Sequence, residues 1–218
     1  MSKKIKTPWP TKAVMQQIYD KHLWGGAEYD FYSGEGSHRP EIVRPYLNAV
    51  ISFLESHDRP LTVCDLGCGD FNIGKHLVPH AKKYIAVDIV NSLIERNKQT
   101  FLNPDLEFLC LDIAKDDLPK ADCVILRQVL QHLSNNEILK ILGQLSPYRY
   151  IILTEHLPNE PFTANHDIIS GQGNRTKYSS GVKLTEAPFY FNIKKQTVLN
   201  NVVLENQKGR ISTLLFTR

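Results

Sequence analysis

The chain has 218 residues, of which 42% are apolar and 22% charged, and its formal net charge is +3. This length and composition are typical of one globular domain with a small helical or loop addition. Positive and negative residues are interspersed, so the charge gives no indication of a nucleic acid partner. No apolar run is long enough to cross a membrane, and the polar N-terminus does not have the pattern of a signal peptide.

The first 59 residues predict a cap of helix and loop, and we assign the main domain to residues 60–218. Apolar side chains recur at helical spacing over residues 42–54, and we expect Pro45 in the first turn of that helix or at a kink. Before it, residues 24–39 combine glycines with aromatic side chains. That composition is suited to a mobile flap over a ligand.

Short apolar runs then alternate with helical segments up to about residue 155. Such runs are typical of parallel strands covered on both faces, and the alternation predicts a parallel sheet with right-handed crossovers. Ser134 and Glu137 have the spacing of a capping box before the last of these helices. The tail predicts an antiparallel hairpin around Lys208 and Gly209. The expected strands are 61–66, 84–88, 106–111, 123–126, 150–154, 197–205 and 210–217, and the expected helices between the first five are 73–80, 92–101 and 135–145.

The first of these strands runs into a glycine turn, with the sequence VCDLGCGDF at residues 63–71. Glycine tolerates positive φ and allows the backbone to approach a ligand closely. Asp65 and Asp70 flank the glycines, and two carboxylates at this place would repel a pyrophosphate. The same two carboxylates would attract a cationic ligand. The turn therefore favours S-adenosylmethionine, which carries a sulfonium and an ammonium group, as the cofactor, with S-adenosylhomocysteine as the product.

Two further carboxylates follow the next two strands. Asp88 ends the second strand, where an acidic residue hydrogen-bonds the hydroxyls of a bound ribose. Asp112 ends the third strand, where it would accept the exocyclic amine of adenine. Taken alone, each aspartate has a simpler interpretation as a helix cap. Together with the glycine turn, however, they bring polar groups from three strand ends to the crevice where α/β sheets bind ligands.

These segments resemble the class I S-adenosylmethionine-dependent methyltransferases, through residues 63–71, 84–88, 106–112 and 121–133 and through the tail hairpin. The resemblance implies an α/β fold, with a Rossmann-like, doubly wound, mostly parallel sheet of seven strands in the order 3-2-1-4-5-7-6 and one antiparallel strand. The cofactor-binding residues that it implies are Asp65, Gly67, Cys68 and Gly69 for the methionine part, Asp88 and Ile89 for the ribose, Asp112 and Ile113 for the adenine, and Arg127 and Gln128 at the exit of the fourth strand.

The chain departs from the family pattern at Phe71, where the family often has glycine. We therefore expect the next helix to begin differently, with Gly74 providing the close contact between helix and strand. Asn72 argues against the main alternative, an NAD-dependent oxidoreductase, because a dinucleotide-binding turn needs glycine or alanine at that position.

Two regions outside the cofactor site have the composition of substrate-binding lids. The first is the segment 24–39, and the second is a long polar insertion over about 156–190. Both have the alternative interpretation of ordinary surface loops, and His132 has that of a helix-packing histidine. The candidate catalytic residues are His38, His156 and Glu155, and the candidate substrate-binding residues are Trp24, Tyr32, Arg39 and His166.

The expected reaction is methyl transfer to a small molecule, at an oxygen nucleophile. The chain further resembles a branch of uncharacterised bacterial methyltransferases through Trp24-Gly25-Gly26, residues 33–37 and residues 165–168. The Asp/Asn-Pro-Pro-aromatic motif of nucleobase amine methylation is absent from the fourth strand, and no basic stripe indicates nucleic acid. Two alternatives stay open: a methyltransferase that acts on RNA or protein, and a non-catalytic protein that binds S-adenosylmethionine.

The cysteines are Cys64, Cys68, Cys110 and Cys123. They lack the paired spacing of a structural zinc site, and we expect no metal. Buried, reduced thiols indicate a reducing compartment, most simply the cytoplasm.

Overall fold

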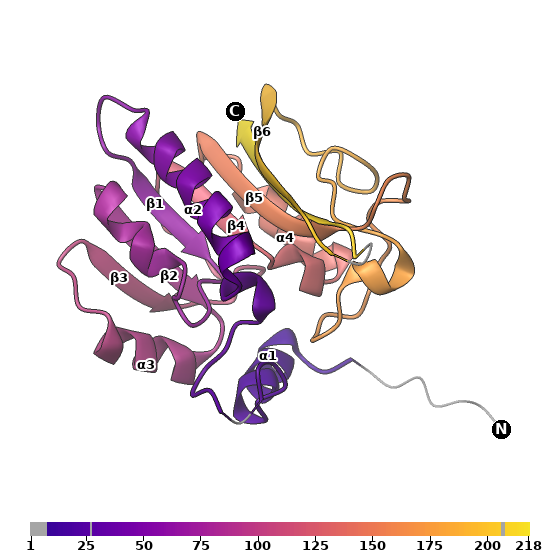
Figure 1. Ribbon diagram of the computed structural model, residues 1–218, viewed down its shortest axis with the longest axis horizontal. Helices are drawn as coiled ribbons and strands as arrows, with labels where there is room; N and C mark the ends of the chain where they lie inside the picture. Colours follow the sequence, from indigo (N-terminus) through magenta and orange to yellow (C-terminus); the bar gives the residue numbers. More distant parts are fainter. Residues whose placement is uncertain (1–7, 27, 206–207) are drawn as a thin grey trace.

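The computed structural model describes residues 8–26, 28–205 and 208–218. Its centre is a seven-stranded sheet in the order β3-β2-β1-β4-β5-β7-β6, as the resemblance implied (Figure 1). The first five strands pair in parallel, and β7 runs antiparallel to β5 and β6. The strands are β1 (Thr62–Leu66), β2 (Lys83–Asp88), β3 (Leu106–Cys110), β4 (Cys123–Arg127), β5 (Tyr150–Leu157), β6 (Lys195–Val203) and β7 (Arg210–Thr217).

Both faces of the sheet are covered by helices, which explains the continuous apolar strands. Alternate residues of β1 point to opposite faces, so that Val63 and Cys64 belong to different cores. The core around Val63 includes α2 (Pro40–Glu55) through residues such as Tyr46, and α3 (Asn91–Thr100) contributes Ile94 to it. The core around Cys64 includes α4 (Asn135–Gln144), through Ile138, Ile141 and Leu142. The arrangement is therefore a doubly wound α/β fold.

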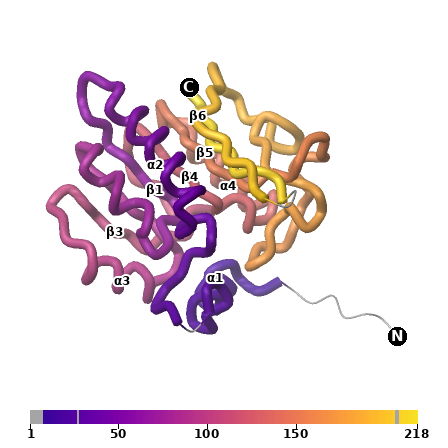
Figure 2. The backbone as a smooth tube through the Cα atoms, viewed as in Figure 1, coloured from indigo at the N-terminus to yellow at the C-terminus, as the bar shows by residue number. Residues whose placement is uncertain are grey.

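A fourth helix, α1 (Thr11–Asp20), lies beyond the carboxyl ends of the parallel strands (Figures 1 and 2). Only two of its residues, Ile18 and Tyr19, are buried. The expected helix over 42–54 is present as α2, which is longer, with Pro40 in its first turn and Pro45 in its second. The division of the chain at residues 59 and 60 stays a prediction.

The expected helix over 73–80 is wrong. Two short 3-10 helices, Gly74–His76 and Val78–His80, occupy this segment. Pro79 explains the difference, because proline has no N–H for a helical hydrogen bond and its ring clashes with the carbonyl four residues earlier. Gly74 makes a close contact, but with the ring of Phe71 in the turn and not with a strand: a Cβ there would lie 2.2 Å from that ring.

The capping box of α4 is confirmed. The Glu137 N–H donates to the Ser134 hydroxyl over 3.3 Å, and the Ser134 N–H donates to the Glu137 carboxylate over 3.4 Å. Residues 158–194 connect β5 to β6 and contain a 3-10 helix, η5 (Arg175–Tyr178). Within the described parts of the chain, no helix has the length and apolar character needed to cross a membrane.

Candidate active site

A cavity of about 370 Å³ opens at the carboxyl ends of β1, β2 and β4. Parallel strands all end at the same edge of the sheet, so the polar residues that follow them converge there. All ten residues that the resemblance assigned to the cofactor line this cavity. They are Asp65, Gly67, Cys68, Gly69, Asp88, Ile89, Asp112, Ile113, Arg127 and Gln128.

The glycine turn after β1 has a backbone that only glycine fits well. Gly67 and Gly69 have φ angles of 84° and 56°. A Cβ on Gly67 would lie 2.4 Å from the Val129 side chain, and one on Gly69 would lie 2.2 Å from the Ser33 hydroxyl. The turn is therefore in close contact with the segment after β4 on one side and with the N-terminal segment on the other.

Asp88 holds this turn at the end of β2. One carboxylate oxygen accepts the Gly69 N–H over 3.1 Å, and the other accepts the Val90 N–H over 3.0 Å. Burial raises the pKa of Asp88, and these backbone hydrogen bonds oppose that shift. Each oxygen has one backbone donor and retains a lone pair for another donor, such as a ribose hydroxyl.

Asp112 also lines the cavity. Its carboxylate accepts the Ala114 N–H over 3.1 Å and lies 2.7 Å from the Lys115 ammonium group. Its side chain is 15% exposed. The acidic group is therefore held in place at the cavity wall beside Ile113.

Two buried groups of opposite charge lie deeper in the cavity. Asp65 accepts a hydrogen bond of 2.9 Å from the Tyr84 hydroxyl. Burial raises the pKa of Asp65 to about 6, while Tyr84 and Arg127 act in the opposite direction. Arg127 lies with its guanidinium 4.7 Å from the centre of the Tyr46 ring. It donates to the Ser37 hydroxyl over 2.9 Å and to the Gly36 carbonyl.

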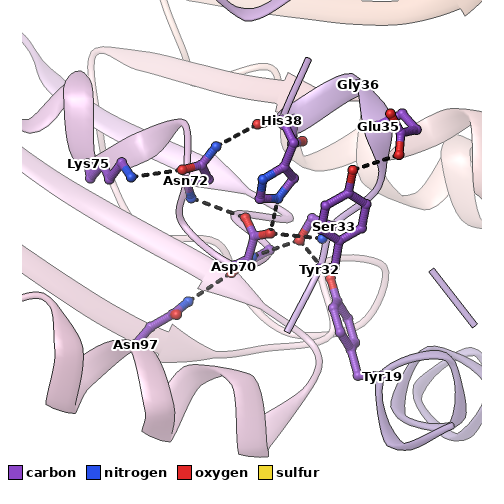
Figure 3. A network of polar contacts seen from close by, with 12 residues as sticks. Tyr19, Tyr32, Ser33, Glu35, Gly36, His38, Asp70, Asn72, Lys75 and Asn97 are labelled. Carbon is purple, nitrogen blue, oxygen red and sulfur yellow. Dashed lines mark hydrogen bonds and ion pairs between the residues drawn. The ribbon is translucent and has the colours of Figure 1, made fainter. Parts of the chain in front are cut away.

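Asp70, the second acid of the glycine turn, holds the N-terminal segment in place (Figure 3). Its Oδ2 accepts the Ser33 N–H over 2.9 Å and lies 2.6 Å from His38 Nε2. Its own N–H donates to the Ser33 hydroxyl over 2.7 Å. The His38 ring stacks on Tyr32 with 4.1 Å between the ring centres. These contacts fix residues 33–38, here called the 33–38 loop, against the glycine turn.

The three candidate bases occupy different environments. His156 lines the cavity, whereas His38 and Glu155 are not among the lining residues. His156 Nε2 donates to the Lys208 carbonyl over 2.6 Å, so the neutral ring carries its free lone pair on Nδ1. Within the described residues, that Nδ1 has no hydrogen-bond partner. The contact with Lys208 therefore fixes the tautomer of the neutral ring, and the assignment of His156 as a base stays a prediction.

Glu155 is 2% exposed and caps the turn after β4. Its two oxygens accept the N–H groups of Leu130 and Gln131 over 3.1 and 3.0 Å. Burial raises the pKa of Glu155 to about 8, while Arg175 and the two N–H donors oppose the shift. Its assignment as a catalytic group stays a prediction, and its contacts give it a structural role.

Of the candidate substrate-binding residues, Trp24 alone lines the cavity. Tyr32 stacks on His38 and donates to Glu35 over 2.8 Å. Arg39 pairs with Glu41 at the surface. His166 stacks on Tyr178, with 4.5 Å between the ring centres. The structure therefore places one of these four residues at the cavity, and the roles of all four in substrate binding stay predictions.

Several lining residues were not expected from the sequence, and His132 is the most prominent. Its Nδ1 donates to the Gly173 carbonyl over 3.1 Å, and its Nε2 accepts from the Gln131 amide over 3.1 Å. Burial lowers the pKa of His132, which keeps the ring neutral. The Trp24 ring lies 5.3 Å from the His132 ring. Both nitrogens are engaged, so His132 forms a fixed wall of the cavity. Gln172 and Asn174 also line the cavity.

Arg175 holds the insertion beside this wall and is 1% exposed. It donates to the carbonyls of Leu130, Leu133 and His166 over 2.7 to 2.9 Å, and to the Asn135 side chain over 2.8 Å. One buried side chain therefore connects the insertion to the turn after β4 and to the start of α4. Its position within the insertion gave no indication of this role.

Among the residues that the structure describes, no group of three or more His, Cys, Asp or Glu side chains is placed to hold a metal ion. The four cysteines are unpaired.

Residues 63–147 match the family model of a methyltransferase domain. No curated protein sequence matches the chain. Its structure is similar to N-methyltransferase NodS from Bradyrhizobium japonicum WM9 in complex with S-adenosylhomocysteine, with a TM-score of 0.68, 10% identity and coverage of 94% of this chain and 98% of that one.

Two other similar structures are those of magnesium protoporphyrin IX methyltransferase (ChlM) from Synechocystis PCC 6803 and of 1,6-didemethyltoxoflavin-N1-methyltransferase from Burkholderia thailandensis. The first has a TM-score of 0.61, 16% identity and coverage of 98% of this chain and 99% of that one. The second has a TM-score of 0.59, 15% identity and coverage of 100% of this chain and 93% of that one. Residues 63–147 therefore contain a methyltransferase domain, and the order of the whole sheet is that of the Rossmann-like methyltransferase fold.

Proposed function

We propose that the protein transfers a methyl group from S-adenosylmethionine to a small-molecule acceptor, at an oxygen nucleophile. The observation that carries this proposal is that one cavity is lined by the glycine turn, Asp88 and Asp112 and also by Trp24 and His156. The same cavity therefore has the groups for an adenosyl cofactor and aromatic and polar groups for an acceptor.

The residues present fit the cofactor. The cavity volume of about 370 Å³ lies within the range of small-molecule sites. Asp88 retains acceptor capacity for a ribose diol, and Asp112 can accept the amine of adenine. Asp65 and Asp70 add negative charge beside the glycine turn, which favours a ligand with a sulfonium and an ammonium group.

The bound cofactor supplies a methyl group on a sulfonium centre, which is attacked in line by the acceptor. The protein contributes mainly alignment of donor and acceptor, and removal of a proton where the acceptor is a hydroxyl. His156 is the proposed base, because it lines the cavity and its Nδ1 lone pair has no hydrogen-bond partner within the described residues. His132 and Trp24 are proposed to position the acceptor.

The two candidate lids favour a small molecule as the acceptor rather than a macromolecule. Asp70 holds the 33–38 loop, and Arg175 holds the insertion, so that two segments surround the acceptor side. Similar folds include methyltransferases whose names state small-molecule substrates, such as N-acetylserotonin and 1,6-didemethyltoxoflavin. The unpaired cysteines agree with a reducing compartment, and the cytoplasm is our proposed location.

Methyl-labelled S-adenosylmethionine tests this proposal. The protein and the labelled cofactor are incubated in three separate reactions. One contains a small-molecule extract, one total RNA and one total protein, each from a bacterial lysate. We expect label in the small-molecule fraction. The rate of labelling should change little between 50 and 200 mM salt, because a steep loss of affinity with salt is typical of binding to a polyanion such as RNA. Label in RNA or protein would contradict the proposed acceptor class. Cofactor binding without label in any fraction would favour the non-catalytic alternative.

An Asp88→Ala variant tests the cofactor side separately. We expect its affinity for S-adenosylmethionine to fall at least tenfold, about 1.4 kcal/mol, because the ribose loses its acceptor. Calorimetry measures this affinity, and Asp105→Ala, before the amino end of β3, is the matched control. Unchanged affinity in Asp88→Ala would contradict the ribose assignment.

A further inference from the structure

Gln131 contacts the two histidines, His132 and His156, that line the cavity. The residue is 6% exposed and lines the cavity as well. Its Oε1 accepts the backbone N–H of His156 over 3.0 Å, and its Nε2 lies 3.1 Å from Nε2 of His132. Its own N–H donates to Glu155 Oε2 over 3.0 Å. Gln131 therefore binds the end of β5 through both its backbone and its side chain, and the same side chain reaches the His132 ring.

The groups at the two ends of this set of contacts decide where each proton lies. A backbone N–H can only donate, so the Gln131 oxygen must face His156 and its NH₂ group must face His132. Nε2 of His132 must then accept. At the other end the Gly173 carbonyl can only accept, so Nδ1 of His132 carries the proton that it donates over 3.1 Å. The hydrogen bonds thus run in one direction, from the end of β5 to the insertion, and they fix one tautomer of His132.

His132 also holds the insertion at the cavity. Its backbone carbonyl accepts the Gly171 N–H over 2.9 Å, and its ring donates to the Gly173 carbonyl, so the two contacts lie on either side of Gln172. Gln172 lines the cavity, and its amide donates to the Leu23 carbonyl of the N-terminal segment over 3.1 Å. A rotation of the His132 ring would therefore displace the part of the insertion that contacts the N-terminal segment.

We propose that Gln131 is a positioning residue for the methyl acceptor, and that its amide sets the place of the proposed base and of the His132 wall together. This inference rests on the proposed function, in which His156 removes the acceptor proton and His132 positions the acceptor. Gln131 acts through these two residues. Glutamine is the neutral side chain of this length that accepts with one terminal atom and donates with the other, as its two neighbours require.

Two substitutions separate the two ends of the amide. Gln131→Met has nearly the same size and removes both ends, the acceptor for His156 and the donor to His132. His132→Phe keeps an aromatic ring but removes both nitrogens, so it interrupts only the branch to the insertion. Gln196→Met is the matched control for the first substitution, because Gln196 lies exposed on β6 and outside the cavity lining.

Nitrogen NMR of histidine-labelled protein tests the hydrogen bonds without turnover, because an imidazole nitrogen with a proton and one with a lone pair have different chemical shifts. The chain has 8 histidines, and the His132 signals are assigned by their loss in His132→Phe. In the wild-type protein we expect a proton on Nδ1 of His132 and none on Nε2. In Gln131→Met the Nε2 signal should move toward that of a free lone pair, and in Gln196→Met it should not move.

Kinetics with the acceptor found by labelling test the positioning role. We expect Gln131→Met to raise KM for the acceptor about tenfold and to lower kcat about tenfold, because the His132 wall and the anchor of His156 are both lost. His132→Phe should raise KM by about the same factor but leave kcat within about twofold of wild type, since His156 keeps its anchor. The double variant should have the kinetics of Gln131→Met, because both substitutions interrupt the same contacts. Affinity for S-adenosylmethionine should not change in any of the variants.

A wild-type His132 with its proton on Nε2 would overturn the inference, and the spectrum provides this test even if Gln131→Met does not fold. Unchanged KM and kcat in Gln131→Met would overturn it as well, and so would effects of the two substitutions that add in the double variant. A wild-type protein with the expected tautomer but no label in any acceptor fraction would instead contradict the proposed function.

Discussion

Nε2 of His38 lies 2.6 Å from Oδ2 of Asp70, the carboxylate that follows the second glycine of the β1 turn. The same oxygen accepts the Ser33 N–H, so one atom holds both ends of the 33–38 loop. His38 and Asp70 are 32 positions apart in the sequence, and the loop lies on the turn that forms the cofactor side. Asp70 thus connects a candidate lid to the binding turn.

We expect Asp70→Asn to release the 33–38 loop. The asparagine amide keeps only one oxygen acceptor. In the Oδ1 place that oxygen leaves the NH₂ group facing Ser33 and His38, and in the Oδ2 place it leaves the NH₂ group facing the Asn72 N–H, so a donor at this junction is unpaired in either orientation. Leaving such donors unpaired costs about 1–2 kcal/mol, so amide hydrogen exchange at Ser33 should become roughly tenfold faster.

Asp122→Asn is the control for this experiment, because Asp122 also accepts a backbone N–H, from Thr62, at the other end of β1. Its substitution should leave exchange in the 33–38 loop unchanged. Protection of Ser33 that is equal in Asp70→Asn and in wild type would show that the loop is held by other contacts.

The conformation of the glycine turn makes a second prediction. In Gly67→Ala, the new Cβ would meet the Val129 side chain at 2.4 Å in a backbone with φ of 84°. Both effects destabilise the folded state, and we expect the free energy of unfolding to fall by about 1–3 kcal/mol. Urea denaturation measures it.

Gly143→Ala is the opposite case in the same chain. Gly143 lies within α4, and a Cβ there meets no atom within 4 Å. Alanine should therefore stabilise the protein by up to about 1 kcal/mol through its helix propensity. If Gly67→Ala were as stable as wild type, the close contact between the turn and Val129 would be disproved.

Much of the cofactor side followed from the sequence, because its physical causes are local. Parallel strands buried on both faces appear as short apolar runs, and their carboxyl ends meet at one edge. This is why Asp65, Asp88 and Asp112 could be assigned to one cavity before their positions were known. The prediction of a helix over 73–80 is wrong because Pro79 interrupts the helical hydrogen bonding there.

The acceptor side was harder to predict because its residues lie in loops, where composition does not determine the direction of a side chain. His38 belongs to a segment with the composition of a lid. Its ring contacts Asp70, however, and is not part of the cavity lining. His132 was interpreted as a packing residue, although it lines the cavity. Arg175 resembles any surface arginine in the sequence, and its burial depends on carbonyl groups up to 45 residues away.

The orientation of His156 makes a third prediction. If its Nδ1 removes the acceptor proton, His156→Ala should lower kcat at least a hundredfold on the acceptor found by labelling, with cofactor affinity within twofold of wild type. His80→Ala, at a surface histidine that contacts Glu55, should keep full activity. Full turnover by His156→Ala would exclude this residue as the base.

Gly209→Ala tests the support of that ring. A Cβ on Gly209 would lie 2.1 Å from the Leu157 carbonyl in a backbone with φ of 90°, so the hairpin turn must move. The neighbouring Lys208 carbonyl, which accepts from His156, would move with it. We expect a lower kcat than in wild type with unchanged cofactor affinity. When Gly209→Ala is added to His156→Ala, it should not lower the rate further.

The pKa of Asp65 makes the last prediction, on the pH dependence of cofactor binding. Burial raises the pKa of Asp65 to about 6, above the ordinary value of about 4. The carboxyl is therefore mostly ionised at pH 7 and mostly protonated at pH 5. An α-amino group stays protonated over this window, and so does Arg127. If the ionised carboxylate binds the ammonium, the affinity for S-adenosylhomocysteine should fall about tenfold from pH 7 to pH 5.

A comparison of ligands separates Asp65 from its neighbours. Asp88 also has a raised pKa, but it is assigned to the ribose. That ribose is shared by 5′-methylthioadenosine, a ligand with the same nucleoside and sulfur as S-adenosylhomocysteine but without its amino acid end. Any effect of Asp88 should therefore appear with both ligands, whereas the effect of Asp65 should appear with S-adenosylhomocysteine alone. In Asp65→Asn the difference between the two ligands should no longer depend on pH. Calorimetry at pH 5, 6 and 7 measures it, and a pH dependence that is identical for both ligands in the wild-type protein would show that Asp65 does not bind the ammonium.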